Sequence, residues 1–89
     1  MAASSRRYDL EIKRSAEREM DRLSADIHRR ISKAILTLES EPRPVGSRKL
    51  EAGRGFRLRV GDYRVLYTVD DDNQRVIIYS VAHRREAYR

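Results

Sequence analysis

The spacing of apolar residues changes along the chain, and each change predicts a different element. Residues 8–12 alternate between apolar and charged side chains, which is typical of a half-buried strand. In residues 16–23 and 27–38 the apolar side chains recur every three or four positions, which predicts two amphipathic helices. Ser15 and Ser24 precede these runs and are the expected N-caps. We expect the two helices to form an antiparallel pair.

The second half of the chain predicts a loop and then three strands. Residues 41–55 contain both prolines and three of the four glycines, so the second helix should end before them and a loop should follow. Residues 56–60 and 63–70 alternate, and the Gly61-Asp62 pair between them predicts a tight hairpin turn. Residues 75–83 have a continuous apolar centre, typical of a strand buried on both faces. The expected fold is α+β: an N-terminal strand, two antiparallel helices, then three antiparallel strands in one sheet with the helices on one face.

Length and composition restrict the domain organisation and the chemistry. With 89 residues the chain is expected to form a single domain over residues 8–89, after a short disordered head at residues 1–7. It has no cysteine and only two histidines, so a zinc site would need carboxylates, and we expect neither a metal nor a small-molecule cofactor. His28, on the polar side of the second helix, is expected to be structural. No apolar run approaches the length of a membrane span, so a cytoplasmic protein without a membrane partner is expected.

The charge balance indicates a polyanionic partner. Twenty Lys and Arg against fourteen Asp and Glu give a formal net charge of +6 and a pI near 10.2. The excess of positive charge is concentrated in residues 43–64, which contain seven basic residues and only two acidic ones, Glu51 and Asp62. Such a concentration favours a binding site over general solubility.

The predicted hairpin would gather arginines on one face. A turn at Gly61-Asp62 sets Arg59 opposite Arg64, with Arg57 two residues along on the same face. Directly opposed like charges destabilise a sheet, so this arrangement favours an anion bound between them. The spacing of about 7 Å between alternate residues of a strand also resembles that of neighbouring phosphates. The alternative is a solvated face that keeps the strand soluble.

The chain ends with SVAHRREAYR, residues 80–89, in which polar and titratable side chains from His83 onward directly follow an apolar run. Together with GDYRVLY, the AHRREAY motif resembles the RelE/ParE superfamily of bacterial toxin-antitoxin toxins, on the RelE side, and the similarity extends over nearly the whole chain from Tyr8. The resemblance implies a RelE-like fold and a protein that enters the ribosomal A site and cleaves messenger RNA there. It matches Arg64, Arg84 and Tyr88 to the family's functional residues.

The sequence departs from the family at one important point. Arg57 and Arg59 stand where the best-known member carries two lysines. A guanidinium stays protonated at any useful pH, so it binds phosphate well and removes a proton poorly.

Metal-independent RNA cleavage defines the roles that these residues would fill. The 2′-hydroxyl must lose its proton, the charge on the phosphate must be stabilised and the leaving 5′-oxygen must gain a proton, which gives a 2′,3′-cyclic phosphate and a 5′-hydroxyl. Arg64, with Arg57 or Arg59, would hold the phosphate. Arg84 would stabilise the transition state or the leaving group, and Tyr88 would stack on a base or help to move a proton.

The general base stays open between two residues of the terminal segment. His83 and Glu86 both titrate, and histidine suits neutral pH best. The alternatives are that His83 is only a polar strand end and that Glu86 is only a partner for an arginine. The other candidates for RNA contact are Lys49, Arg54 and Arg85. For the first two, a solvated loop is an equal alternative to contact with ribosomal RNA.

Three functions remain open from the sequence. The first is a ribosome-dependent endoribonuclease with the ribosome, messenger RNA and a cognate antitoxin as partners. The second is a ParE-like inhibitor of DNA gyrase that hydrolyses nothing, and the third is a basic binding module that retains only antitoxin binding. In the first two cases an acidic, partly disordered antitoxin segment would fold on the toxin.

Overall fold

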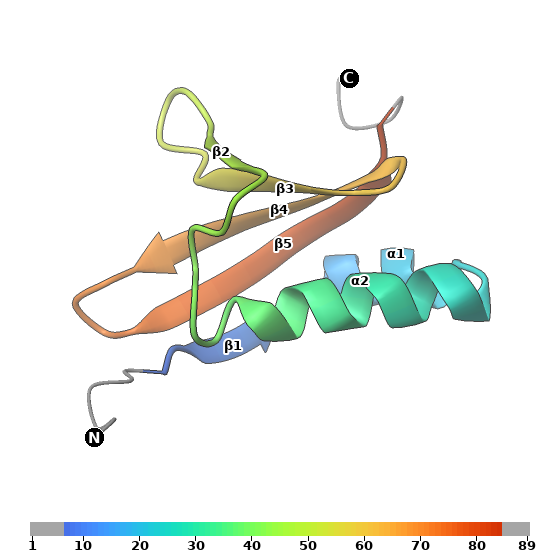
Figure 1. Cartoon of the computed structure of the whole chain (residues 1–89), viewed down its shortest axis with the longest axis horizontal. Coiled ribbons are helices and arrows are strands. Elements are labelled where there is room, and N and C mark those ends of the chain that lie inside the picture. The colour runs from blue at the N-terminus through green and yellow to red at the C-terminus, as the bar shows by residue number, and fades with distance from the viewer. Residues whose placement is uncertain (1–6, 85–89) are drawn as a thin grey trace.

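The computed structural model describes residues 7–84, which form a five-stranded sheet with two helices on one of its faces (Figure 1). In chain order the elements are β1 (Asp9–Ile12), α1 (Arg14–Asp21), α2 (Ala25–Thr37), β2 (Ser47–Lys49), β3 (Phe56–Val60), β4 (Tyr63–Asp70) and β5 (Arg75–His83). The strand order is β1-β5-β4-β3-β2, with β1 parallel to β5 and the other pairs antiparallel. The predicted α+β fold is confirmed, although its sheet has an additional strand. Most of the predicted disordered head, residues 1–6, lies outside the described residues.

The additional strand is β2, which lies within the stretch expected to be a loop, so that prediction is wrong over Ser47–Lys49. All three of its residues are polar and none is buried, so no hydrophobic alternation marks the strand in the sequence. It forms because its main chain pairs with β3, where Arg48 lies opposite Arg57.

The helix boundaries follow one of the two predicted caps. Ser24 caps α2 as expected, because its side chain accepts a hydrogen bond from a main-chain N–H in the first turn. The prediction for Ser15 is wrong, because the N-cap of α1 is Lys13. The Ser15 hydroxyl instead donates a hydrogen bond of 3.3 Å to the carbonyl oxygen of Tyr79, which ties α1 to β5. Helix α2 ends at Thr37, before the first proline, as predicted.

The core lies between the helices and the face of the sheet that they cover. Its buried residues are Ala16, Met20, Ile31, Ile35 and Leu38 from the helical half and Leu58, Val65, Tyr67, Val76, Ile78 and Val81 from the sheet. In β5 these residues occupy one face, while Ile77 and Tyr79 are only half-buried. The expectation that β5 is buried on both faces is therefore wrong, because no helix covers the second face.

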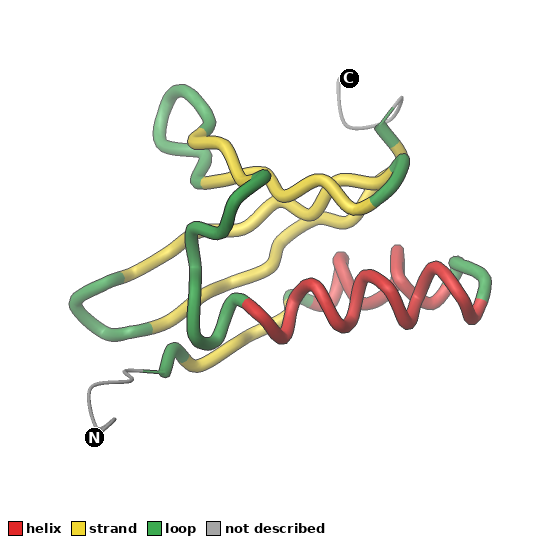
Figure 2. The backbone as a smooth tube through the Cα atoms, viewed as in Figure 1, coloured by secondary structure: helices red, strands yellow, loops and turns green. Residues whose placement is uncertain are grey.

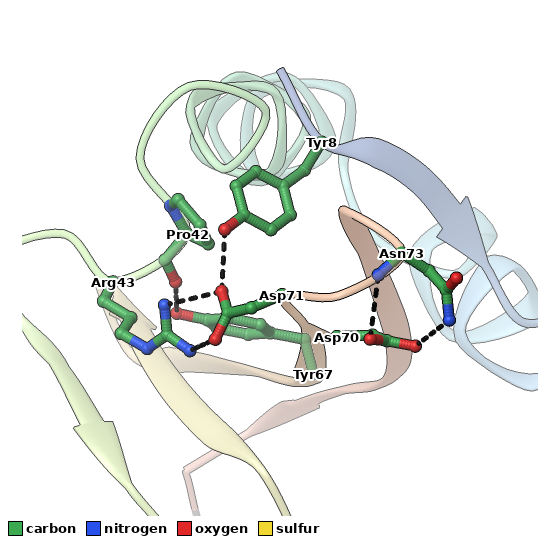
Figure 3. Close-up of polar contacts among 7 residues, drawn as sticks. All are labelled: Tyr8, Pro42, Arg43, Tyr67, Asp70, Asp71 and Asn73. Atoms are coloured by element: carbon green, nitrogen blue, oxygen red, sulfur yellow. Dashed lines mark hydrogen bonds and ion pairs between the residues drawn. The ribbon is translucent and has the colours of Figure 1, made fainter. Parts of the chain in front are cut away.

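A polar cluster holds the long crossing from α2 to β2 against the end of the sheet (Figures 2 and 3). The Arg43 guanidinium donates two hydrogen bonds, of 3.2 and 2.7 Å, to the Asp71 carboxylate in the β4–β5 turn. Tyr8 donates to the same carboxylate at 2.7 Å, and the buried Tyr67 hydroxyl donates to the carbonyl oxygen of Pro42 at 2.7 Å. These bonds fix the end of the sheet opposite the Gly61-Asp62 turn.

Candidate functional site

The β3–β4 hairpin has the register that its turn predicted. Val60 pairs with Tyr63 and Arg59 pairs with Arg64 across the two-residue turn. Gly61 has a φ of 60°, in the left-handed region that a primed hairpin turn requires of its first central residue. The predicted opposition of two arginines is therefore present.

The side of the sheet that the helices leave uncovered carries a group of arginines, which we call the arginine face: Arg48, Arg57, Arg59 and Arg64. Strand alternation sets them there, because Leu58 and Val65 between them point into the core. Arg48 and Arg59 are exposed and Arg57 is half-buried, whereas Arg64 is only 4% exposed. Arg48 joins the group through the β2–β3 pairing, so the expectation of a loop at β2 left it out of the predicted face.

An irregularity in the pairing of β4 with β5 decides which face the end of β5 presents. Leu66 lies opposite Ser80, but the next residue, Tyr67, lies opposite Ile78. Tyr79 is therefore an extra residue with no opposite on β4, as in a β-bulge. Beyond it the alternation of β5 changes phase, so that Val81 belongs to the core.

This change of phase directs Arg84 toward the arginine face. Ala82 lies opposite Arg64, and the main-chain N–H of Arg84 donates a 2.8 Å hydrogen bond to the carbonyl oxygen of Asp62, which continues the same ladder. Arg84 lies just after the end of β5, two residues beyond Ala82, so continued strand alternation would place it on the side of Arg64. Arg84 is also exposed.

Two other candidates lie elsewhere. His83 pairs with Tyr63 and packs its ring edge-to-face against the tyrosine at 5.3 Å, on the side of β5 that carries Val81. Lys49 is exposed and pairs with Phe56, so alternation directs it away from the arginine face. The candidates Arg85, Glu86 and Tyr88 lie outside the described residues. A catalytic role for His83 and for these three stays a prediction.

A pocket of about 860 Å³ lies between the arginine face and the β2–β3 loop. It is lined by Leu50, Glu51, Ala52, Gly53 and Arg54 from the loop and by Arg57, Arg64, Leu66, Thr68 and Tyr79 from the sheet. Figure 1 shows this loop rising from the sheet on the side away from the helices. Arg64 thus borders the pocket although little of its surface is exposed, and Arg54 borders it from the opposite wall.

Tyr79 connects the two walls of the pocket. Its hydroxyl donates a 2.8 Å hydrogen bond to the carbonyl oxygen of Arg54. Burial raises the pKa of Tyr79 above the ordinary value of 10, and the nearby charge of Arg54 opposes that shift. The phenol therefore remains protonated, and a donor, throughout the neutral range. Tyr79 lies in the middle of an apolar run, so no pattern in the sequence marks it as a site residue.

Among the described residues no group of three or more His, Cys, Asp or Glu side chains is arranged to hold a metal ion. None of the helices in residues 7–84 is long and apolar enough to cross a membrane.

Comparison with known proteins relates the whole fold to one group. Residues 10–88 match the family described as ParE toxin of type II toxin-antitoxin system, parDE. Toxin RelG of Mycobacterium tuberculosis (strain ATCC 25618 / H37Rv) is 33% identical over 84 residues, which cover 92% of this chain and 97% of that protein.

Solved structures agree with this relationship. The archaeal RelE-RelB complex from Pyrococcus horikoshii OT3 contains a chain that matches with a TM-score of 0.78 and 29% identity, covering 86% of this chain and 94% of the other. A chain of the toxin-antitoxin complex RelBE2 from Mycobacterium tuberculosis matches with a TM-score of 0.77 and 29% identity, covering 86% of this chain and 98% of the other.

Proposed function

The chain belongs to the RelE/ParE superfamily of type II toxin-antitoxin toxins, and from this we propose that it is a ribosome-dependent endoribonuclease that cleaves messenger RNA in the ribosomal A site. The observation that carries the proposal is the gathering of Arg57, Arg59 and Arg64 on one face of the sheet, with Arg84 continuing the ladder onto the same face. Four cationic side chains from three neighbouring segments are then available to one bound phosphodiester. A phosphodiester whose negative charge grows in the transition state fits such a group of cations.

Each arginine has a role that its chemistry suits. Arg64, fixed in the central strand β4, would bind the phosphate together with Arg57 or Arg59 through charge-assisted hydrogen bonds. Arg84, exposed after β5, would stabilise the transition state or the leaving 5′-oxygen. Tyr88 would stack on a base or help to transfer a proton. The products would be a 2′,3′-cyclic phosphate and a 5′-hydroxyl.

The general base is proposed to be His83 or Glu86, since arginine is too basic to accept the proton. The edge-to-face contact of His83 with Tyr63 favours Glu86 as the base. This contact holds the imidazole of His83 on the opposite side of β5 from Arg64. A His83→Ala variant with normal cleavage would assign the role to Glu86.

A cognate antitoxin is proposed as the physiological partner. The solved relatives are the RelE-RelB complex from Pyrococcus horikoshii and the toxin-antitoxin complex RelBE2 from Mycobacterium tuberculosis. An acidic antitoxin segment that folds over the arginine face would neutralise the charges that bind RNA.

One observation favours a second function. The matching family is described by the ParE toxin, so a ParE-like inhibitor of DNA gyrase is the alternative. Such a protein would block supercoiling without cutting RNA. The arginine face supports the nuclease, because two of its members, Arg57 and Arg64, line one pocket that could hold a phosphodiester.

Purified ribosomes programmed with a defined messenger test the proposal. Mapping of 5′ ends should show new ends inside codons with the wild-type protein and at least a hundredfold fewer with Arg84→Ala. Arg29→Ala is the matched control, because Arg29 is an exposed arginine on α2 that pairs with Asp26 in the same helix, and this variant should cut normally. Absence of cuts with inhibition of gyrase supercoiling would support the ParE-like function, and absence of both would leave a basic binding module.

A further inference from the structure

The pocket beside the arginine face has two chemically different parts. Arg57 and Arg64 border it along the sheet, whereas Leu66 and the ring of Tyr79 provide an apolar surface next to them. At about 860 Å³ the pocket falls within the range of about 300–1,000 Å³ that is usual for small-molecule sites. An apolar surface adjacent to paired guanidinium groups matches a base attached to its phosphate.

The β2–β3 loop, which forms one wall of this pocket, is held in place by hydrogen bonds and by close packing on β4. The main-chain N–H of Leu50 donates a 2.7 Å hydrogen bond to the carbonyl oxygen of Gly55, which closes the loop. Gly55 has a φ of 93°, and a Cβ there would lie 2.1 Å from the carbonyl oxygen of Tyr67, so the loop rests directly on β4. The hydroxyl of Tyr79 fixes the other side of the loop at Arg54.

The position of Tyr79 in the sheet supports a role beyond packing. As the extra residue of the bulge it has no opposite on β4. Bulges commonly re-aim a side chain beside a functional site. Tyr79 is half-buried and is one of the residues that line the pocket.

We propose that this pocket is a nucleotide subsite, in which the ring of Tyr79 is the platform for one RNA base while Arg57 and Arg64 bind the adjoining phosphate. The subsite rests on the proposed function, because it assigns the nucleotide contacts of a messenger-cleaving toxin. The ring binds the base, and the hydroxyl positions Arg54 and its loop as the facing wall. Stacking on an aromatic ring tolerates every base, so the subsite adds affinity more than sequence preference.

The direct test needs no ribosome. The full-length ¹⁵N-labelled protein is titrated with 2′-O-methyl dinucleotides, which cannot be cleaved, and separately with inorganic phosphate, while amide resonances are followed by NMR. The dinucleotide should shift the amides of Ala52, Gly53 and Tyr79, whereas phosphate should shift only those near Arg57 and Arg64. Loop amides that do not respond at millimolar dinucleotide would overturn the subsite.

Substitutions separate the ring from the hydroxyl. Tyr79→Leu should weaken dinucleotide binding about tenfold, because stacking on the ring is lost. Tyr79→Phe keeps the ring and should stay within about threefold of wild type, since it loses one ordinary hydrogen bond. Tyr8→Phe, which removes a phenol bond of similar length to Asp71 at the other end of the sheet, should leave binding unchanged.

The outcomes distinguish the subsite from the proposed function. Thermal melting should first show that both proteins are folded. Equal affinity of wild type and Tyr79→Leu for the dinucleotide would then limit Tyr79 to a structural role and refute the subsite. Dinucleotide binding that depends on Tyr79 in a protein that cuts nothing on ribosomes would sustain the subsite and refute the endoribonuclease. On ribosomes, Tyr79→Leu should raise KM more than it lowers kcat, because the ring contacts a base away from the reacting atoms.

Discussion

Neutralising Arg59 should make the fold more stable and the protein less active. Arg59 lies directly opposite Arg64, and side chains in such pairs have Cβ atoms about 4.5–5.5 Å apart. Guanidinium groups that keep the separation of the Cβ atoms, about 5 Å, repel by about 0.8 kcal/mol in water, and salt near 0.1 M reduces this to about 0.5 kcal/mol. Arg64 is 4% exposed, so water screens the pair less than this estimate assumes. Arg59→Gln should therefore raise the free energy of unfolding by about 0.5 kcal/mol, which corresponds to roughly 2–4 °C in Tm for a domain of this size.

Salt dependence identifies repulsion as the cause of the gain. Urea unfolding of wild type and Arg59→Gln at 0.05 M and 1 M NaCl should show the gain at low salt and its near disappearance at high salt, where the Debye length is about 3 Å. Arg75→Gln is the control, because Arg75 is an exposed arginine in the same sheet with Glu11 at 3.7 Å, and its loss should give no gain. A variant no more stable than wild type at low salt, or equally stabilised at both salt concentrations, would refute the reasoning. In the ribosome assay the same variant should cleave at least tenfold more slowly.

Three further predictions concern the supports of the site. Tyr67→Phe should lower the free energy of unfolding by about 1–3 kcal/mol in thermal or urea unfolding, because it leaves the buried carbonyl oxygen of Pro42 without its donor. Gly55→Ala should destabilise the fold by at least about 2 kcal/mol and shift the NMR signals of the pocket loop, since its Cβ would meet the carbonyl oxygen of Tyr67 at 2.1 Å. Hydrogen bonds from Arg43 and then Tyr8 lower the pKa of Asp71 below its ordinary 3.8. The ionised Asp71 therefore stabilises the fold above pH 4, and this stabilisation is lost as the pH falls through the lowered pKa. Asp71→Asn should flatten the acid side of a plot of unfolding free energy against pH.

The sequence predicted a feature correctly wherever residues close together in the chain determine that feature. The Gly61-Asp62 turn fixed the register of the hairpin, because a two-residue connection between alternating runs permits one pairing only. That register alone predicts Arg59 opposite Arg64, and the structure confirms the pair. Ser24 was equally predictable, since its side chain satisfies a donor in the turn that directly follows it.

The remaining features depend on contacts that no local pattern records. The three polar residues of β2 become a strand only because β3 offers its main chain, so Arg48 was absent from the predicted face. Lys13 replaced Ser15 as the cap of α1, and the serine hydroxyl bonded to β5 instead. The bulge at Tyr79 was also invisible, because an extra residue in an apolar run leaves the composition of the strand unchanged.

That bulge is the point where the fold and the proposed chemistry depend on each other. Val76 and Ile78 face the helices, so an unbroken alternation would continue with Ser80 and Ala82 toward the core and Val81 toward solvent. It would also turn Arg84 to the helix side of the sheet, away from Arg64. The extra residue, Tyr79, shifts the alternation of β5 by one position. Because of this shift Val81 is buried and Arg84 is directed to the side of the arginine face. A strand that must bury its apolar centre and also present an arginine a few residues later needs such a break in phase, and the side chain at the break is the one that holds the pocket loop.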